Sequence, residues 1–204
     1  ALPEPVFWIG YARLDAGHDR EGFARARASG CLKLFIGLET GSDRILARFN
    51  KGVDQARARR VLLDAAAAGL AVHTFLMTGF PGEDASDRQA TLDLLADVWA
   101  AFDPFGVSFD LFALTGELET DLMADPTAFG WQGPQSDAGN DLAWQFSLLK
   151  GLAAAESLAE FKAELHSLAD RVLGREFGLR HAALAQDSLH LLLLEARLHS
   201  CTAK

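Results

Sequence analysis

The chain has 204 residues, of which 50% are hydrophobic, and its formal net charge is −9 at pH 7. This size and composition are typical of a folded protein with one well-buried core and exclude a disordered chain. The acidic balance argues against nucleic acid or an anionic membrane as the main partner, and no apolar run is long enough to span a membrane.

The two cysteines, Cys31 and Cys201, are far apart and match no metal-binding or redox spacing. We therefore predict no metal site in this chain and the reducing cytoplasm as its compartment. Abundant alanine, and more arginine than lysine, favour a GC-rich bacterial source. The first residue is Ala1, which either removal of an initiator methionine or a longer parent protein would explain.

Strands and helices alternate through the first part of the chain. Apolar runs predict strands at 6–13, 33–38, 71–77 and 107–114. Helical patterns between them predict helices at 21–29, 43–49, 54–68 and from about 85 to 102, with Ser42 capping the second and Asp84 or Ser86 the last. Strands that recur about every thirty residues between helices indicate βαβ units. The sequence therefore predicts an α/β fold with about four parallel strands.

The pattern changes after Leu114. Residues 115–145 are rich in Gly, Pro, Asp and Gln, which predicts a long irregular segment. Two helices should follow: one that is opened by a capping box at Ser157 and ends near 173, and a leucine-rich one at 179–200 that needs covering by this chain or a partner. We divide the chain into residues 1–115 and residues 116–204, the second part being an irregular linker with a helical C-terminal extension.

Two strand–turn–helix units carry motifs. The first is Gly-Leu-Glu-Thr-Gly-Ser at 37–42, followed by Asn-Lys-Gly at 50–52; the second is Gly-Phe-Pro-Gly-Glu at 79–83, followed by Thr91. In order and spacing these motifs resemble the C-terminal half of the radical SAM domain, in the branch that often carries a cobalamin-binding domain. The Cys-x-x-x-Cys-x-x-Cys motif that holds a [4Fe–4S] cluster in that family is not in this sequence.

The resemblance implies a partial (β/α) barrel whose third to sixth strands are the four predicted here. It also implies part of an enzyme that cleaves S-adenosylmethionine reductively at a [4Fe–4S] cluster and starts radical chemistry on an unassigned substrate, with cobalamin as a further candidate cofactor. Because the cluster ligands are missing, we expect this chain alone to be inactive, so whether it is itself an enzyme stays open. An apolar first strand without edge protection fits a missing N-terminal half as its neighbour.

The resemblance assigns cofactor contacts to the ends of three strands. Glu39 would contact the ribose or amino group of S-adenosylmethionine, and Arg13 its carboxylate. The alternative for Glu39 is an acid stabilised by the dipole of the next helix, and for Arg13 a salt bridge with Asp15. Backbone groups and an apolar side chain would hold the adenine in the segment that includes Met77, Gly79 and Phe80, where Glu83 is expected to cap the following helix.

Polar residues also share one face of the fourth predicted strand. Ser108 and Asp110 lie opposite its apolar side chains, so we predict that they face the substrate. His73 would join them, although a hydrogen-bonded core histidine is an equally good interpretation. Because parallel strands end at one edge of a sheet, Arg13, Glu39, Gly79 and Asp110 should gather there.

A second hypothesis comes from another functional class. The chain would then be a naturally short, cluster-free α/β domain that binds a partner or peptide through its sheet edge and last helix. An unrelated complete α/β enzyme is disfavoured because the sequence shows no nucleophile–base set and no phosphate-binding loop. No catalytic residue, substrate or oligomeric state is assigned.

Overall fold

A computed structural model describes residues 6–14, 17–114, 121–129, 155–174 and 194 of the chain. Its strands are β1 (Trp8–Ala12), β2 (Cys31–Glu39), β3 (Ala71–Thr78) and β4 (Val107–Ala113). Its helices are α1 (Arg20–Ala28), α2 (Asp43–Arg48), α3 (Gln55–Ala67), α4 (Ala85–Trp99), η1 (Pro104–Gly106), α5 (Asp121–Ala124), η2 (Pro126–Phe129) and α7 (Ala155–Leu173).

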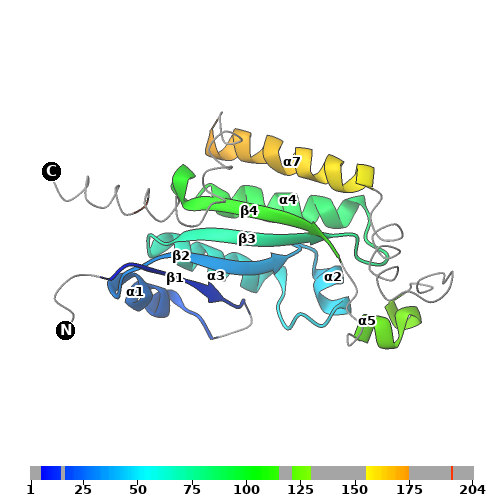
Figure 1. The fold of residues 1–204 in the computed structure, drawn as a ribbon, viewed down its shortest axis with the longest axis horizontal. Coiled ribbons are helices and arrows are strands. Elements are labelled where there is room, and N and C mark those ends of the chain that lie inside the picture. Colours follow the sequence, from blue (N-terminus) through cyan, green and yellow to red (C-terminus); the bar gives the residue numbers. More distant parts are fainter. Residues whose placement is uncertain (1–5, 15–16, 115–120, 130–154, 175–193, 195–204) are drawn as a thin grey trace.

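The strands form one sheet in the order β1-β2-β3-β4, and every neighbouring pair is parallel. Each strand is followed by a helix before the next strand begins, as the thirty-residue spacing predicted (Figure 1). The predicted α/β fold with four parallel strands and a helical C-terminal part is therefore confirmed. None of the helices in the described ranges is long and apolar enough to cross a bilayer.

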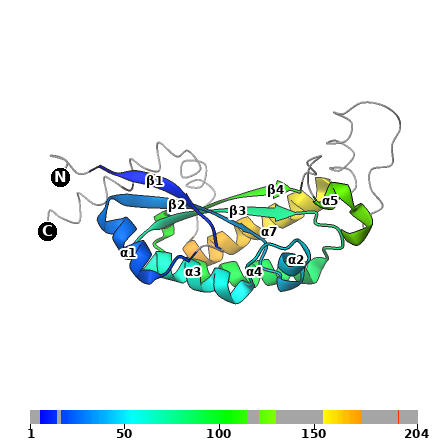
Figure 2. The ribbon, with the colours of Figure 1, turned by 90° about the horizontal axis from the view of Figure 1, so that it is seen from below.

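Helices α1, α3 and α4 cover one face of the sheet, and the core lies between these two layers (Figure 2). The helix-facing side chains of β2 are aliphatic and buried: Leu34, Ile36 and Leu38. Helix α7 lies along α4 and adds Phe161 and Leu165 to the same core (Figure 1). The division at residue 115 stays a prediction.

Two helix starts follow the sequence rules for capping. Ser42 caps α2, because its hydroxyl accepts the backbone N–H of Ile45 at 3.3 Å. Asp84 caps α4 and accepts the N–H groups of Ser86 and Asp87, while the Asp87 carboxylate accepts the N–H of Asp84 at 2.9 Å. This reciprocal pair is a capping box, so of the two predicted caps for α4 the structure selects the aspartate.

Two predictions for the second part of the chain are corrected. Ser157 lies inside α7, which already includes Ala155, so it does not open that helix; alanine and glutamate before it are strong helix formers. Within the segment predicted to be irregular, residues 121–129 form the short helices α5 and η2. The leucine-rich helix predicted at 179–200 falls outside the described residues, apart from Leu194.

Candidate cofactor and substrate site

The sheet face opposite helices α1, α3 and α4, here called the open face, carries three of the predicted site residues, His73, Ser108 and Asp110, in two neighbouring rows. Across the four strands, the first row pairs Tyr11, Phe35, His73 and Ser108. The next row, two residues nearer the C-terminal ends of the strands, pairs Gly37, Phe75 and Asp110. Because side chains alternate along a strand, residues of both rows share one face.

Glu39 ends β2 in an unusual backbone conformation. Its φ is 63°, in the left-handed region, and the register between β2 and β3 shifts between Gly37 and Glu39. The N–H of Thr40 donates to the carbonyl of Leu38 at 2.8 Å, which closes a tight turn at this point. A non-glycine residue at positive φ costs about 1–3 kcal/mol, and such residues cluster at functional sites.

This turn lays the Glu39 carboxylate over Gly37. A Cβ atom built on Gly37 would lie 2.8 Å from Oε1 of Glu39. The group in the way is the far end of a flexible side chain, so an alanine here would push the carboxylate aside and leave the backbone in place. Gly37 therefore determines where the carboxylate sits.

A depression of about 310 Å³ lies at this end of the sheet. Its charged lining residues are Arg13, Glu39 and Lys51, and the rest are Ala12, Leu14, Gly37, Leu38, Leu46 and Val53. Burial raises the pKa of Glu39, and the nearby charge of Lys51 opposes that rise. Arg13 and Glu39 thus line the same depression. Lys51 was not predicted as a site residue, although it belongs to the Asn-Lys-Gly motif.

The turn after β2 is fixed to α4 by buried hydrogen bonds. Thr91 Oγ1 accepts the N–H of Gly41 at 2.8 Å and lies 3.1 Å from Oγ1 of Thr40. Ser42 Oγ donates to Asp87 at 2.6 Å, and Arg44 forms an ion pair with the same carboxylate. The polar residues of this motif therefore position the turn that carries Glu39, which gives Thr91 a physical reason to accompany the motif.

The turn after β3 is closed from within by Glu83. Its Oε2 accepts the N–H of Gly79 at 2.5 Å and the hydroxyl of Thr78 at 2.8 Å, while Gly79 has a φ of 86°. Burial raises the pKa of Glu83, and the hydrogen bonds from Gly79 and Thr78 oppose that rise. The expectation that Glu83 caps the next helix was wrong, because Asp84 is the cap.

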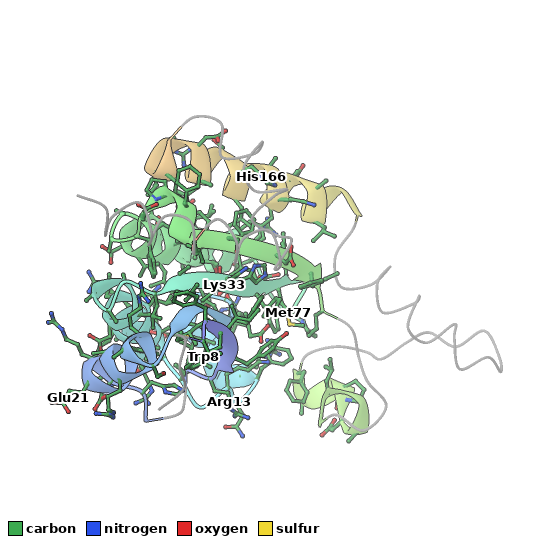
Figure 3. The ribbon with its side chains drawn as sticks, turned by 60° about the vertical axis from the view of Figure 1, so that its left-hand side comes forward. Trp8, Arg13, Glu21, Lys33, Met77 and His166 are labelled. Carbon is green, nitrogen blue, oxygen red and sulfur yellow. The ribbon has the colours of Figure 1, made fainter. Side chains whose placement is uncertain are left out.

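Phe80 and Met77 belong to a small apolar cluster beside this turn. Phe80 is 2% exposed and its ring centroid lies 4.9 Å from that of Phe49, and Met77 packs against the same cluster. Met77 and Arg13, both labelled in Figure 3, come from the ends of β3 and β1. The structure thus places Phe80 inside a core. Contacts of Met77, Gly79 and Phe80 with adenine stay predictions.

His73 joins the two polar residues of β4. Its Nδ1 lies 2.9 Å from Oγ of Ser108, and its Nε2 lies 3.4 Å from Oδ2 of Asp110. His73 and Ser108 are buried, whereas the Asp110 side chain is 45% exposed. The burial of His73 agrees with its interpretation as a core histidine, whereas the side chain of Asp110 is partly exposed to solvent. A role for these three residues toward a substrate stays a prediction.

The donor set does not fit an iron–sulfur cluster. The described ranges hold no group of three or more His, Cys, Asp or Glu side chains that could bind a metal ion. The full sequence has two cysteines, and Cys31 is a buried thiol at the opposite end of β2 from Glu39. At about 3.3 Å per residue the strand separates these two residues by roughly 26 Å.

Comparisons with known proteins agree with the motifs. The family model of the radical SAM superfamily matches residues 12–95, which run from the end of β1 into α4. The tRNA-2-methylthio-N(6)-dimethylallyladenosine synthase of Chlorobium phaeobacteroides is 33% identical over 86 residues, which is 41% of this chain and 20% of that enzyme. The enzyme of Chlorobium limicola is matched to the same extent, so the chain spans about one-fifth of the length of these curated relatives.

A solved radical SAM structure shares the fold. Coproporphyrinogen III oxidase (HemN) of Escherichia coli, a radical SAM enzyme, aligns with a TM-score of 0.52 and 15% identity over 80% of this chain and 32% of that one. The cobalamin-dependent S-adenosylmethionine radical enzyme OxsB aligns with a TM-score of 0.43 and 16% identity, over 63% of this chain and 19% of that one.

Proposed function

We propose that this chain supplies part of the S-adenosylmethionine site of a radical SAM enzyme, a superfamily whose model matches residues 12–95. The observation that carries the proposal is the placement of Glu39. Its carboxylate is held over Gly37 by a strained turn, in the same depression as Arg13 and Lys51. In the whole enzyme this cofactor is the source of the 5′-deoxyadenosyl radical.

The charges of the depression fit the polar groups of this cofactor. The Glu39 carboxylate is an acceptor for its ammonium group or ribose hydroxyls. Arg13 or Lys51 would hold its carboxylate, for which a guanidinium is the better match because it can donate two parallel hydrogen bonds. A depression of about 310 Å³ is at the lower end of ligand sites, so these residues would hold one end of the cofactor.

The cluster ligands must come from outside these 204 residues. We propose that a Cys-x-x-x-Cys-x-x-Cys segment, in a longer form of this protein or in a partner chain, places the [4Fe–4S] cluster beside the depression. An in-frame motif of this kind in the coding sequence upstream of Ala1 would support the first source. Cobalamin is a further proposed cofactor, and this proposal rests on the sequence resemblance alone. The cytoplasm is the proposed compartment.

The names of the relatives do not identify a substrate for this chain. The Chlorobium enzyme is named for a modified tRNA nucleoside, but this chain spans one-fifth of it. The net charge of −9 disfavours a direct role of this chain in gripping a phosphate backbone. A small molecule or a peptide is the substrate class we propose.

The test is binding of S-adenosylmethionine to the chain as it stands, measured by equilibrium dialysis with the labelled cofactor. We expect saturable binding, and Glu39→Gln should weaken it about tenfold, because a hydrogen bond to a charged acceptor is lost. Glu160→Gln, which changes an exposed glutamate on α7, is the matched control and should bind like the wild-type chain.

Binding that is absent, or unchanged by Glu39→Gln, would overturn the assignment of this site. Absence of binding would also favour the second hypothesis, a cluster-free interaction domain. That hypothesis would then have to rest on a partner for the exposed edge of β1.

A further inference from the structure

The open face carries exposed aromatic side chains outside the depression at Glu39. Tyr11 is 81% exposed and Phe112 is 47% exposed, and the partly buried Phe75 lies near the latter with ring centroids 6.3 Å apart. Phe35 connects Tyr11 to Phe75, at centroid distances of 5.0 and 6.0 Å. Tyr11, Phe75, Phe112 and Asp110 are here called the aromatic patch. Large exposed aromatic groups that share one face mark a binding surface.

One carboxylate lies within this patch. Asp110 pairs with Phe75 in the sheet and precedes Phe112 on the same strand face. Its side chain is 45% exposed, so an oxygen can accept a hydrogen bond from a bound molecule. An aromatic surface that carries one carboxylate selects for a flat ligand with a hydrogen-bond donor.

The Asp110 carboxylate is supported from below. His73, with its Nε2 3.4 Å from Asp110, is held on its other side by Ser108 at 2.9 Å. Both supporting residues are at most 2% exposed. Ser108 fixes the His73 ring on its Nδ1 side, and the ring places its Nε2 beside the carboxylate of the aromatic patch.

We propose that the aromatic patch binds a planar nitrogen heterocycle, whose ring packs against Tyr11 and Phe75 and whose N–H donates to Asp110. The proposal deepens the proposed function, on which it rests, by naming the substrate class of the same enzyme.

The experiment uses the fact that the chain has a single tyrosine. The chain is labelled with 3-fluorotyrosine, so that one ¹⁹F resonance reports Tyr11. It is titrated with indole and with 1-methylindole, which has the same ring system without the N–H group. We expect both probes to shift the resonance saturably, with indole binding about tenfold more tightly because it alone donates to a charged acceptor.

Two variants assign the preference to Asp110. Asp110→Ala should abolish the preference for indole and leave binding of 1-methylindole unchanged. Asp93→Asn alters an exposed acid on α4 and should keep the preference. If Asp110→Ala does not fold, Asp110→Asn replaces the charged acceptor with a neutral one of the same shape and should reduce the preference for indole.

Equal affinities for the two probes, the absence of a shift, or a preference that survives Asp110→Ala would overturn the proposal. None of these measurements contains S-adenosylmethionine. A failure here therefore leaves the Glu39 site standing, and a failure of cofactor binding at Glu39 leaves this result standing.

Discussion

The Thr91 hydroxyl on α4 accepts the backbone N–H of Gly41 at 2.8 Å, across fifty residues of sequence. The same oxygen lies 3.1 Å from Thr40 Oγ1 and donates to the carbonyl of Asp87. All of these groups are buried, so the end of β2 is fixed to α4, the helix that follows β3. The position of Glu39 thus depends on a residue that never touches it.

Thr91→Val should destabilise the fold, because valine has nearly the shape of threonine but cannot accept the Gly41 N–H. A buried donor left without its partner costs about 1–3 kcal/mol. Chemical denaturation of the wild-type and variant chains measures this loss. Thr91→Ser keeps the hydroxyl and should recover most of it. A valine variant as stable as the wild type would show that water satisfies this N–H.

Gly41→Ala should also destabilise the chain, by about 1–3 kcal/mol, as overpacking commonly does. A Cβ on Gly41 would meet the Thr91 Cα at 2.7 Å and the Ala90 carbonyl oxygen at 2.8 Å, and both are backbone atoms. Gly37→Ala is the matched control, since its Cβ meets a movable carboxylate. The control should melt near the wild-type temperature but bind S-adenosylmethionine less well. Equal losses of stability in both variants would contradict this distinction.

Glu39→Gln should change how stability depends on pH. Burial raises the pKa of Glu39 in the folded chain. A raised folded-state pKa gives a contribution to stability that is present below the unfolded-state pKa and is lost as pH rises through the folded-state pKa. Glutamine removes this loss. The melting temperature of the variant relative to wild type should therefore be higher at pH 7 than at pH 4. A difference that does not vary with pH would contradict the burial of this carboxylate.

Anaerobic reconstitution with iron and sulfide should leave the chain without a stoichiometric [4Fe–4S] cluster. Thiolates are the ligands of such clusters, and the two cysteines of the chain match no cluster spacing. Iron and sulfide analysis, together with the visible absorption spectrum, measures the outcome. Four irons per chain with a cluster-type spectrum would refute the prediction.

The alternation of strands and helices was predictable because apolar periodicity is a local property. The parallel order followed from the crossovers, and Ser42 and Asp84 were recognisable as caps from short-range chemistry. Glu39 was recognisable as a site residue only through the family motif.

Long-range contacts were not predictable in the same way. Three features depend on which segments come together in the folded chain. They are the burial of Lys33 beside an aromatic ring, the hydrogen bond between Thr91 and Gly41, and the turn that Glu83 closes. A single sequence gives the residue types but not these tertiary contacts. The prediction for Glu83 failed because a carboxylate before a helix is compatible with both a cap and a turn.

The two glycines of the first motif impose different limits on how this sequence can evolve. At position 41 the obstacle is backbone of α4, so no larger residue fits without moving the helix. At position 37 the obstacle is the carboxylate of Glu39, so a larger residue fits if position 39 carries a shorter acid. Positions 37 and 39 should therefore covary among related sequences, and position 41 should stay glycine whatever its neighbours become.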